Sequence, residues 1–134
     1  MKNLLVITLF FFSLGVMAED KYYCKAYKQC HPNLNGCLTG NLDYDLSLLI
    51  DEDSFPKKFV VNGEERRTEG DNRTLKFEPY KITHTIIDGK NTSWEGKREV
   101  VFDKVSKRLK TIGSFIEKGV RNESSVSYRC TAIR

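Results

Sequence analysis

The chain contains two histidines, and histidine is the usual general acid or base near neutral pH. His31 lies between two cysteines in a segment rich in turn-forming residues, where we expect it to be exposed. His84 shares one face of an expected strand with Ile82 and Ile86, which indicates a partly buried structural residue. His84 and His31 could serve as base and acid of a small secreted hydrolase or nuclease, but nothing in their spacing shows that they converge. This function stays open as an alternative.

Other catalytic patterns do not match the chain. The segment Gly113-Ser114-Phe115 comes nearest to the Gly-x-Ser-x-Gly turn of serine hydrolases but fits neither half of it fully. A cysteine nucleophile is not expected, because export into an oxidising compartment would consume the thiols. We therefore predict no catalytic residue, and we expect the protein not to be an enzyme.

Two groups of acidic residues have the chemistry to hold a cation. Asp43 and Asp45 lie on the expected wet face of a strand. The run from Asp51 to Asp53 lacks the calcium-loop spacing with a central glycine and a terminal glutamate, so a solvated turn is favoured. We predict neither a bound metal nor another cofactor.

The four cysteines, Cys24, Cys30, Cys37 and Cys130, indicate two disulfides in an exported protein. Of the three connectivities, we favour Cys30–Cys37, which closes a short turn-rich loop, together with Cys24–Cys130, which joins the ends of the domain. A zinc site fits less well, because zinc-binding cysteines usually form pairs with two to four intervening residues and the intervals here are longer.

The first 18 residues have the three zones of a secretory signal. Lys2 supplies the positive charge, residues from Leu4 to Val16 are mostly apolar, and Ala18 is the small residue before the expected cleavage. The apolar run is too short for a membrane span, which needs about 20 residues. We expect residues 19–134 to form one exported domain, periplasmic or extracellular, without a membrane span.

The net charge of +4 is mild, and basic and acidic residues alternate along the chain. A nucleic-acid-binding protein usually concentrates its positive charge on one stripe. Because the sequence contains no basic block, we expect a mixed, solvated surface and no nucleic-acid partner.

Apolar and polar residues alternate through most of residues 19–134, which is typical of half-buried strands. We expect strands over Lys21–Lys28, Asp43–Asp51, Lys58–Val61, Thr74–Glu78, Tyr80–Ile87, Arg98–Asp103, Arg108–Glu117 and Ser125–Ile133, with a short helix as an alternative for the second. Asn62-Gly63 is a strong hairpin signal, Pro79 should mark an edge or a bulge, and Asp88-Gly89 should end a strand.

Regularly spaced strands without a helical period predict a mainly β fold. The expected architecture is a small antiparallel meander, either an up-and-down barrel or a strongly curved sheet, stabilised by disulfides. A barrel would place the first and last strands side by side, in agreement with a Cys24–Cys130 bridge.

Exposed aromatic residues are the candidate contact surface. Trp94 lies in the long polar connection expected over Asp88–Lys97, where it either plugs the barrel end, which we favour, or anchors a partner. Tyr22, Tyr23 and Tyr27 alternate on the first strand, so some of them must face outward. Three glycosylation sequons, at Asn72, Asn91 and Asn122, fall in expected turns and matter only in eukaryotic secretion.

The resulting hypothesis is an exported, non-enzymatic binding module for a protein or envelope component. The expected shape is similar to that of the periplasmic lysozyme inhibitors, although their Ser-Gly-x-x-Tyr loop has no counterpart in Ser124–Tyr128, so the resemblance implies no site residues. Besides the hydrolase, a barrel carrying a small apolar ligand stays open. Such a barrel would have a cavity lined by residues such as Ile82, Ile86, Val100 and Phe102.

The expected processing makes a first prediction. Intact-mass analysis of the natural protein should give a chain that begins at Glu19 and has no free thiol, because the signal is removed and both disulfides form. A product that retains Met1 and four free thiols would contradict both export and the disulfide-stabilised architecture.

Overall fold

A computed structural model of the chain describes residues 19–32, 36–90 and 94–133. The expected secretory signal, residues 1–18, lies outside the described residues. Every regular element within the described ranges is a strand. The strands are β1 (Glu19–Cys30), β2 (Cys37–Thr39), β3 (Asp45–Asp51), β4 (Lys58–Val61), β5 (Glu64–Arg66), β6 (Arg73–Phe77), β7 (Lys81–Lys90), β8 (Trp94–Asp103), β9 (Arg108–Glu117) and β10 (Val120–Ala132). No helix in the described ranges is long and apolar enough to cross a membrane.

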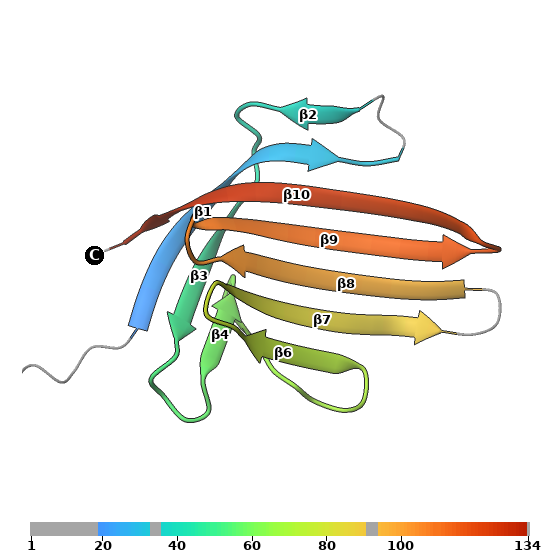
Figure 1. Cartoon of the computed structure of the whole chain (residues 1–134). Helices are drawn as coiled ribbons and strands as arrows, with labels where there is room; N and C mark the ends of the chain where they lie inside the picture. The colour runs from blue at the N-terminus through green and yellow to red at the C-terminus, as the bar shows by residue number, and fades with distance from the viewer. Residues whose placement is uncertain (1–18, 33–35, 91–93, 134) are drawn as a thin grey trace, which may run out of the picture.

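The strands form one antiparallel sheet that curves into a nearly closed barrel (Figure 1). The strand order is β5-β4-β3-β1-β10-β9-β8-β7-β6, and the short β2 pairs with the end of β1. The first and last long strands, β1 and β10, lie side by side as expected from the sequence. The mainly β, antiparallel fold is therefore confirmed.

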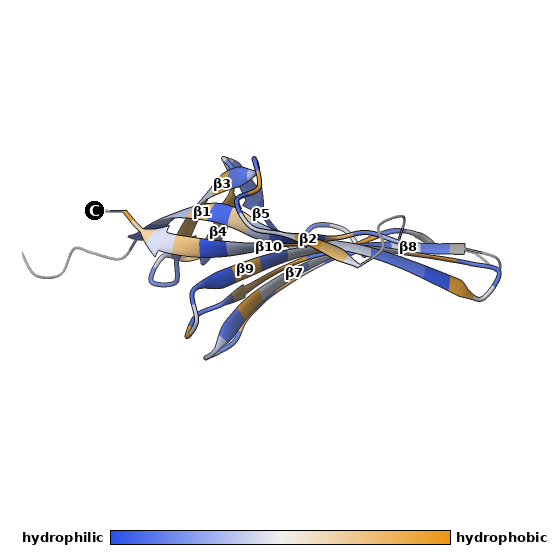
Figure 2. Cartoon of the chain, turned by 90° about the horizontal axis from the view of Figure 1, so that it is seen from above, coloured by the Kyte–Doolittle hydropathy of each residue, from blue (hydrophilic) through white to orange (hydrophobic). Residues whose placement is uncertain are grey.

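Alternation along each strand sets an inner and an outer face. On β1, Tyr22, Cys24 and Ala26 are buried, whereas Tyr23 and Lys25 are exposed. The same alternation is visible as apolar and polar bands along β7 and β9 (Figure 2). Because directly paired residues of neighbouring strands share a face, the register determines which side chains from distant segments meet.

One apolar cluster fills the curved part of the sheet. Its largest fully buried members are Phe59, Phe102, Leu48, Ile82 and Leu109, which come from strands on both sides of the barrel. Beyond this cluster, β7 to β10 run on together as a projecting part of the sheet (Figures 1 and 2). The inner face therefore changes from a packed core to a half-exposed surface along these four strands.

The two end strands of the sheet, β5 and β6, are not paired with each other. Polar contacts bridge this seam instead: the Nε2–H of His84 donates to the carbonyl oxygen of Arg67 at 3.2 Å, and the amide of Leu75 donates to Oγ1 of Thr68 at 3.1 Å. Complete closure, which would have removed both edges, is thus replaced by a seam of loop and side-chain contacts.

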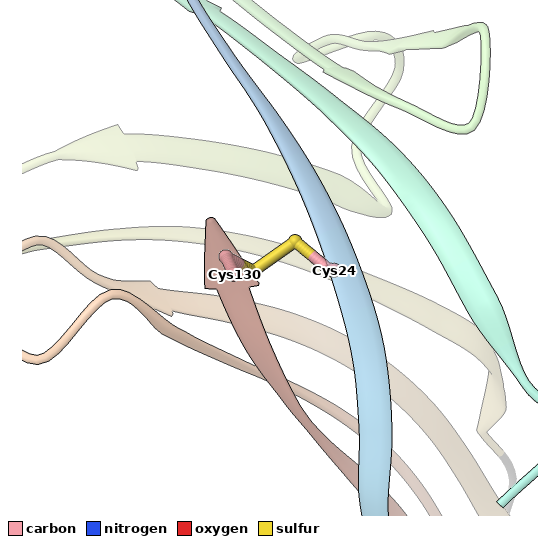
Figure 3. The surroundings of a disulfide bond; sticks show 2 residues. All are labelled: Cys24 and Cys130. Atoms are coloured by element: carbon pink, nitrogen blue, oxygen red, sulfur yellow. A yellow bond between two sulfur atoms is a disulfide. The ribbon is translucent and has the colours of Figure 1, made fainter. Parts of the chain in front are cut away.

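Two disulfides have the favoured connectivity. Cys24–Cys130 joins β1 to β10 at directly paired positions (Figure 3), and Cys30–Cys37 joins β1 to β2. The first links residues 106 positions apart and the second residues 7 positions apart. The longer link constrains the unfolded chain far more on the loop-entropy model.

Several local predictions were wrong. The strand expected to stop at Asp88-Gly89 continues to Lys90 through a bulge between Ile87 and Gly89, so most of the connection expected over Asp88–Lys97 is strand. Pro79, expected to mark an edge or a bulge, lies in the bend that follows the edge strand β6. The short strands β2 and β5 were not expected, because three residues give too little alternation to be seen.

The hairpin signal at Asn62-Gly63 was correct. Asn62 has a φ of 54° and Gly63 a φ of 83°, as a two-residue turn with positive φ at both positions requires. This turn sets β5 against β4 and carries the chain to the seam.

Removing each disulfide in turn tests the role of chain closure. Replacing Cys24 and Cys130 by alanine should lower the free energy of unfolding by about 2 kcal/mol more than replacing Cys30 and Cys37, because the first pair closes the longer loop. Urea unfolding followed by tryptophan fluorescence measures both values. Equal losses would show that the loop-entropy difference does not govern the stability of this sheet.

Candidate functional site

The outer face of the central strands collects basic residues from three strands, β1, β9 and β10. The register pairs Lys25 with Arg129 and Arg129 with Arg108, so three cations lie side by side on β1, β10 and β9. In the next row, Ser127 pairs with both Lys28 and Lys110. We define the basic face as these five cations together with Tyr27; it comprises Lys25, Tyr27, Lys28, Arg108, Lys110 and Arg129.

Tyr27 lies at the centre of the basic face. A register shift between Ala26 and Lys28 leaves Tyr27 as an extra residue of β1, while both neighbours keep their partners on β10. The guanidinium carbon of Arg129 is 4.0 Å from the centroid of the Tyr27 ring, and that of Arg108 is 5.6 Å away. Cation–π contacts of this kind are worth about 0.5–1 kcal/mol at exposed sites, so the tyrosine holds two like-charged groups close together.

Two hollows flank Tyr27 on this face. One, of about 520 Å³, is lined by Lys25, Arg129 and residues 39–41. The other, of about 490 Å³, is lined by Arg108, Lys110 and residues of the β8–β9 hairpin. The basic face is therefore uneven, because the aromatic ring of Tyr27 lies between two shallow depressions.

The Cys30–Cys37 disulfide positions one wall of the basic face. It holds β2 against the end of β1, and the amide of Gly40 then donates a hydrogen bond to the carbonyl oxygen of Tyr27 at 3.0 Å. Gly40 has a φ of +115°, a conformation that side-chain-bearing residues rarely adopt. The short hairpin thus has a positional role beside Tyr27 as well as a stabilising one.

No carboxylate oxygen among the described residues lies within 4.0 Å of the five cations. Elsewhere on the outer face, basic residues are paired, as in Lys97–Glu99 at 3.1 Å and Arg121–Glu123 at 3.1 Å. Like charges directly opposite each other on neighbouring strands cost about 0.2–1 kcal/mol per pair. The two cation–cation pairings at the centre of the basic face are therefore repulsive, while Asp103 attracts Arg108 at the edge of the row.

Carboxylates bound the row of cations at both ends. Asp45 pairs with Lys25 in the register and accepts a hydrogen bond from the hydroxyl of Tyr23 at 2.8 Å. Asp103 pairs with Arg108, and backbone amides of Ser106 and Val105 hold the pKa of its carboxyl below the ordinary value. The positive strip is thus narrow and ends sharply on each side.

The residues predicted as a contact surface separate into different environments. Tyr23 and Tyr27 face outward, in or beside the basic face. Tyr22 was placed wrongly: it is 7% exposed and packs in the core with its ring 5.3 Å from that of Phe102. Trp94 begins β8 rather than lying in a loop, and its side chain lies outside the described part of the structure.

The five cations were not singled out from the sequence. They lie 25, 28, 108, 110 and 129 residues along the chain, and no basic block marks them. The available signal is the position of Lys25, Arg108, Lys110 and Arg129 on the polar side of three expected strands. Strict alternation would place Lys28 on the buried side, and the bulge at Tyr27 brings it to the basic face. This signal becomes informative only when β1, β10 and β9 are known to be neighbours in a fixed register.

The two histidines line one hollow on the opposite, inner face. This hollow of about 350 Å³ lies where the packed core gives way to the projecting part of the sheet. His31 is exposed, whereas His84 is 1% exposed and donates to the Arg67 carbonyl across the seam. The structure therefore brings the histidines to the same hollow, but His84 has the packed, hydrogen-bonded environment of a structural residue.

The residues expected around an apolar ligand are divided between core and hollow. Ile82 and Phe102 are fully packed in the core. Ile86 and Val100 border the inner hollow, together with Arg66 and Arg98. The space beside these two apolar side chains is therefore lined by charged groups as well.

The acidic run at the end of β3 has a structural explanation. The carboxylate of Asp51 accepts hydrogen bonds from the amides of Asp53 and Ser54, and Glu52 forms an ion pair with Lys104 at 2.6 Å. Within the described ranges, no group of three or more histidine, cysteine or acidic residues is arranged to hold a metal ion.

The sequons also differ in their surroundings. Asn72 lies in a turn, as expected, and its side-chain amide donates to the carbonyl oxygen of Ile87 at 3.3 Å. The prediction for Asn122 was wrong, because this residue lies within β10. Asn91 lies outside the described residues.

Comparison with known proteins does not assign a family. No protein-family model matches the chain, and no curated protein or solved structure matches it. The chemistry of the two faces of the sheet is therefore the guide to its function.

The environment of His84 predicts a pH dependence of stability. Burial is the largest influence and lowers the pKa of His84 from 6.5. The hydrogen bond to the Arg67 carbonyl opposes this effect, the charges of Arg66 and Arg73 lower the pKa further, and Glu64 has a smaller opposing effect. As the pH falls below about 6.5, the unfolded chain binds a proton that the folded chain excludes, so the free energy of unfolding decreases until the folded pKa is reached.

Urea unfolding at a series of pH values checks this expectation. Between pH of about 7.5 and about 5.5, stability should fall more in the wild type than in the variant His84→Gln, which keeps a hydrogen-bond donor but does not titrate. Parallel pH profiles would show that His84 is protonated equally easily in the folded and unfolded chains.

Proposed function

We propose that this protein is an exported binding domain that docks an acidic segment of a partner protein on its basic face. The observation that carries the proposal is the row of Lys25, Arg129 and Arg108, which the sheet holds side by side with no carboxylate of the described residues within 4.0 Å. An acidic partner would relieve the repulsion that this arrangement costs the free protein.

The side chains of the basic face suit recognition of carboxylates. Arginine offers a planar fork of N–H donors that matches a carboxylate, and Arg108 and Arg129 are both exposed. Tyrosine and arginine are also enriched among the residues that carry binding energy in protein interfaces. Because cation–π contacts already order the two arginines against Tyr27, less side-chain entropy is lost on binding.

The limited width of the positive strip favours a protein segment over an extended anionic surface. A membrane or a nucleic acid would press negative charge against Asp45 and Asp103 as well as against the cations between them. A folded or extended protein segment can place carboxylates at the centre of the contact and other groups at its ends. Matching of negative groups to a positive patch and of other groups to its borders is the usual form of electrostatic complementarity between proteins.

Export of the chain is supported by its cysteines. Both disulfides are of the kind that forms and persists in oxidising compartments. We therefore expect the partner to be a protein of the periplasm or extracellular medium, or one exposed on the cell envelope.

Charge reversal on the basic face tests the proposal. The double variant Arg108→Glu/Arg129→Glu should bind a poly-glutamate peptide at least about tenfold more weakly than the wild type in calorimetry at low salt, equivalent to about 1.4 kcal/mol. In parallel, tagged wild-type protein should retain an acidic, protease-sensitive component of envelope or culture extract that the double variant loses and that high salt releases.

The matched control is Arg121→Glu, an exposed arginine on the same strand as Arg129 and about 26 Å from it, which already pairs with Glu123. This variant should behave like the wild type in both measurements. Equal binding by all three proteins, or retention of a polyanion that is not a protein, would contradict the proposed function.

A further inference from the structure

The inner hollow contains a second cluster of cationic groups, on the face opposite to the basic face. Its lining combines Arg66 and Arg98 with His84 and the apolar side chains of Ile86 and Val100. It adjoins another hollow of about 570 Å³, with which it shares Arg98, Gly113 and Ser124. The inner hollow is therefore a pocket with an apolar floor, a cationic wall and an approach along the projecting sheet.

The register explains why Arg66 enters this pocket. Arg66 pairs with Phe59, which is fully buried, so its side chain lies on the core face of β5 at the seam. The next residue, Arg67, lies on the outside and pairs with Glu65 at 2.6 Å. Two consecutive arginines thus have opposite environments, one inside the barrel opening and one on its outer surface.

Arg66 has an unsatisfied donor. Its side chain is 18% exposed, and its Nε is buried without a hydrogen-bond partner among the described residues. The nearest carboxylate oxygen, on Glu64, is 3.9 Å from Nη1, which is too long for a hydrogen bond. A buried donor without an acceptor costs about 1–3 kcal/mol, and more when the group is charged.

Glu99 also lines the pocket, but its carboxylate is paired with Lys97 at 3.1 Å, so the two arginines contribute the remaining charge. Arg98 is neutralised locally, because it forms hydrogen bonds to both carboxylate oxygens of Asp88, at 2.6–3.0 Å. Arg66 has only the long contact to Glu64, and Arg73 is close enough to affect both His84 and Asp88 electrostatically. Of the two arginines in the lining, the one less compensated by protein acceptors, Arg66, is therefore also the more enclosed.

We propose that the inner hollow binds a small oxyanion, the carboxylate or phosphate group of a small molecule, with the Arg66 guanidinium as its principal donor. The inference is independent of the proposed docking function, because it concerns the other face of the sheet. An oxyanion accepts the orphaned Nε–H and the neighbouring Nη–H together, which is the bidentate geometry that guanidinium favours. Ile86 and Val100 would contact the apolar body of the same molecule.

The size of the pocket limits the ligand to a small molecule. A hollow of about 350 Å³ falls at the lower end of the range typical of small-molecule sites. Small residues at its entrance, Gly113 and Ser124, pair with each other in the β9–β10 register and leave the backbone accessible. The occupant expected from this lining is compact, with one anionic group and a short apolar part.

Titration with inorganic phosphate and, separately, with acetate tests the site. With only two histidines in the chain, the ring signals of His84 can be followed by NMR during each titration. We expect a saturable shift of these signals and a rise in Tm with at least one anion, and the stronger response distinguishes phosphate from carboxylate as the preferred group.

The uncharged variant Arg66→Met separates a ligand-binding role from a structural one. It should weaken anion binding at least about tenfold, yet fold with undiminished stability in anion-free buffer, since it removes an unsatisfied buried donor. The control Arg67→Met removes the neighbouring outer arginine and should leave the anion response unchanged. No saturable response of the wild type to either anion, or an equal response of Arg66→Met, would overturn the inference, whether or not the basic face binds an acidic partner.

Discussion

The pairing of β1 with β10 is the constraint on which the rest of the structure depends. It joins the two ends of the chain, and Cys24–Cys130 links the strands at directly opposite positions. With this register, Tyr22, Cys24 and Ala26 complete the core on one side, and Lys25 meets Arg129 on the other. A slip of one residue would exchange the two sets, exposing core residues and burying cations. The same pairing therefore fixes both the packing and the charge pattern.

Much of the fold could be predicted because its signals are local. Alternation gave β4 and β9 with their observed bounds, and the Asn62-Gly63 turn required only two adjacent residues. Predictions failed where a local signal was overridden by pairing. Asp88-Gly89 has the composition of a turn, but β8 lies alongside and the extra residue is absorbed as a bulge.

The candidate sites could not be predicted, because they depend on contacts between distant segments and not on local signals. The basic face depends on the adjacency of β1, β10 and β9, and the inner hollow depends on a seam that brings Arg66 toward His84. Neither adjacency has a signature in a single sequence, since alternation indicates that a side chain is exposed but not which distant side chain lies beside it. A mild net charge along the chain consequently says little about local charge on the sheet.

The two cationic clusters differ in how far solvent compensates their charges. On the basic face, solvent screens the repulsion between the cations, so the arrangement costs little free energy. The evidence for binding there is the geometry, a fixed row of cations around Tyr27 with carboxylates at both ends. At Arg66, burial removes the solvent that would otherwise satisfy the guanidinium, so a single missing acceptor has a larger cost. Proximity to the seam explains how such a group can be present at all. Because β5 and β6 are not paired, β5 forms an open edge of the sheet, and Arg66 lies at this edge beside the inner hollow.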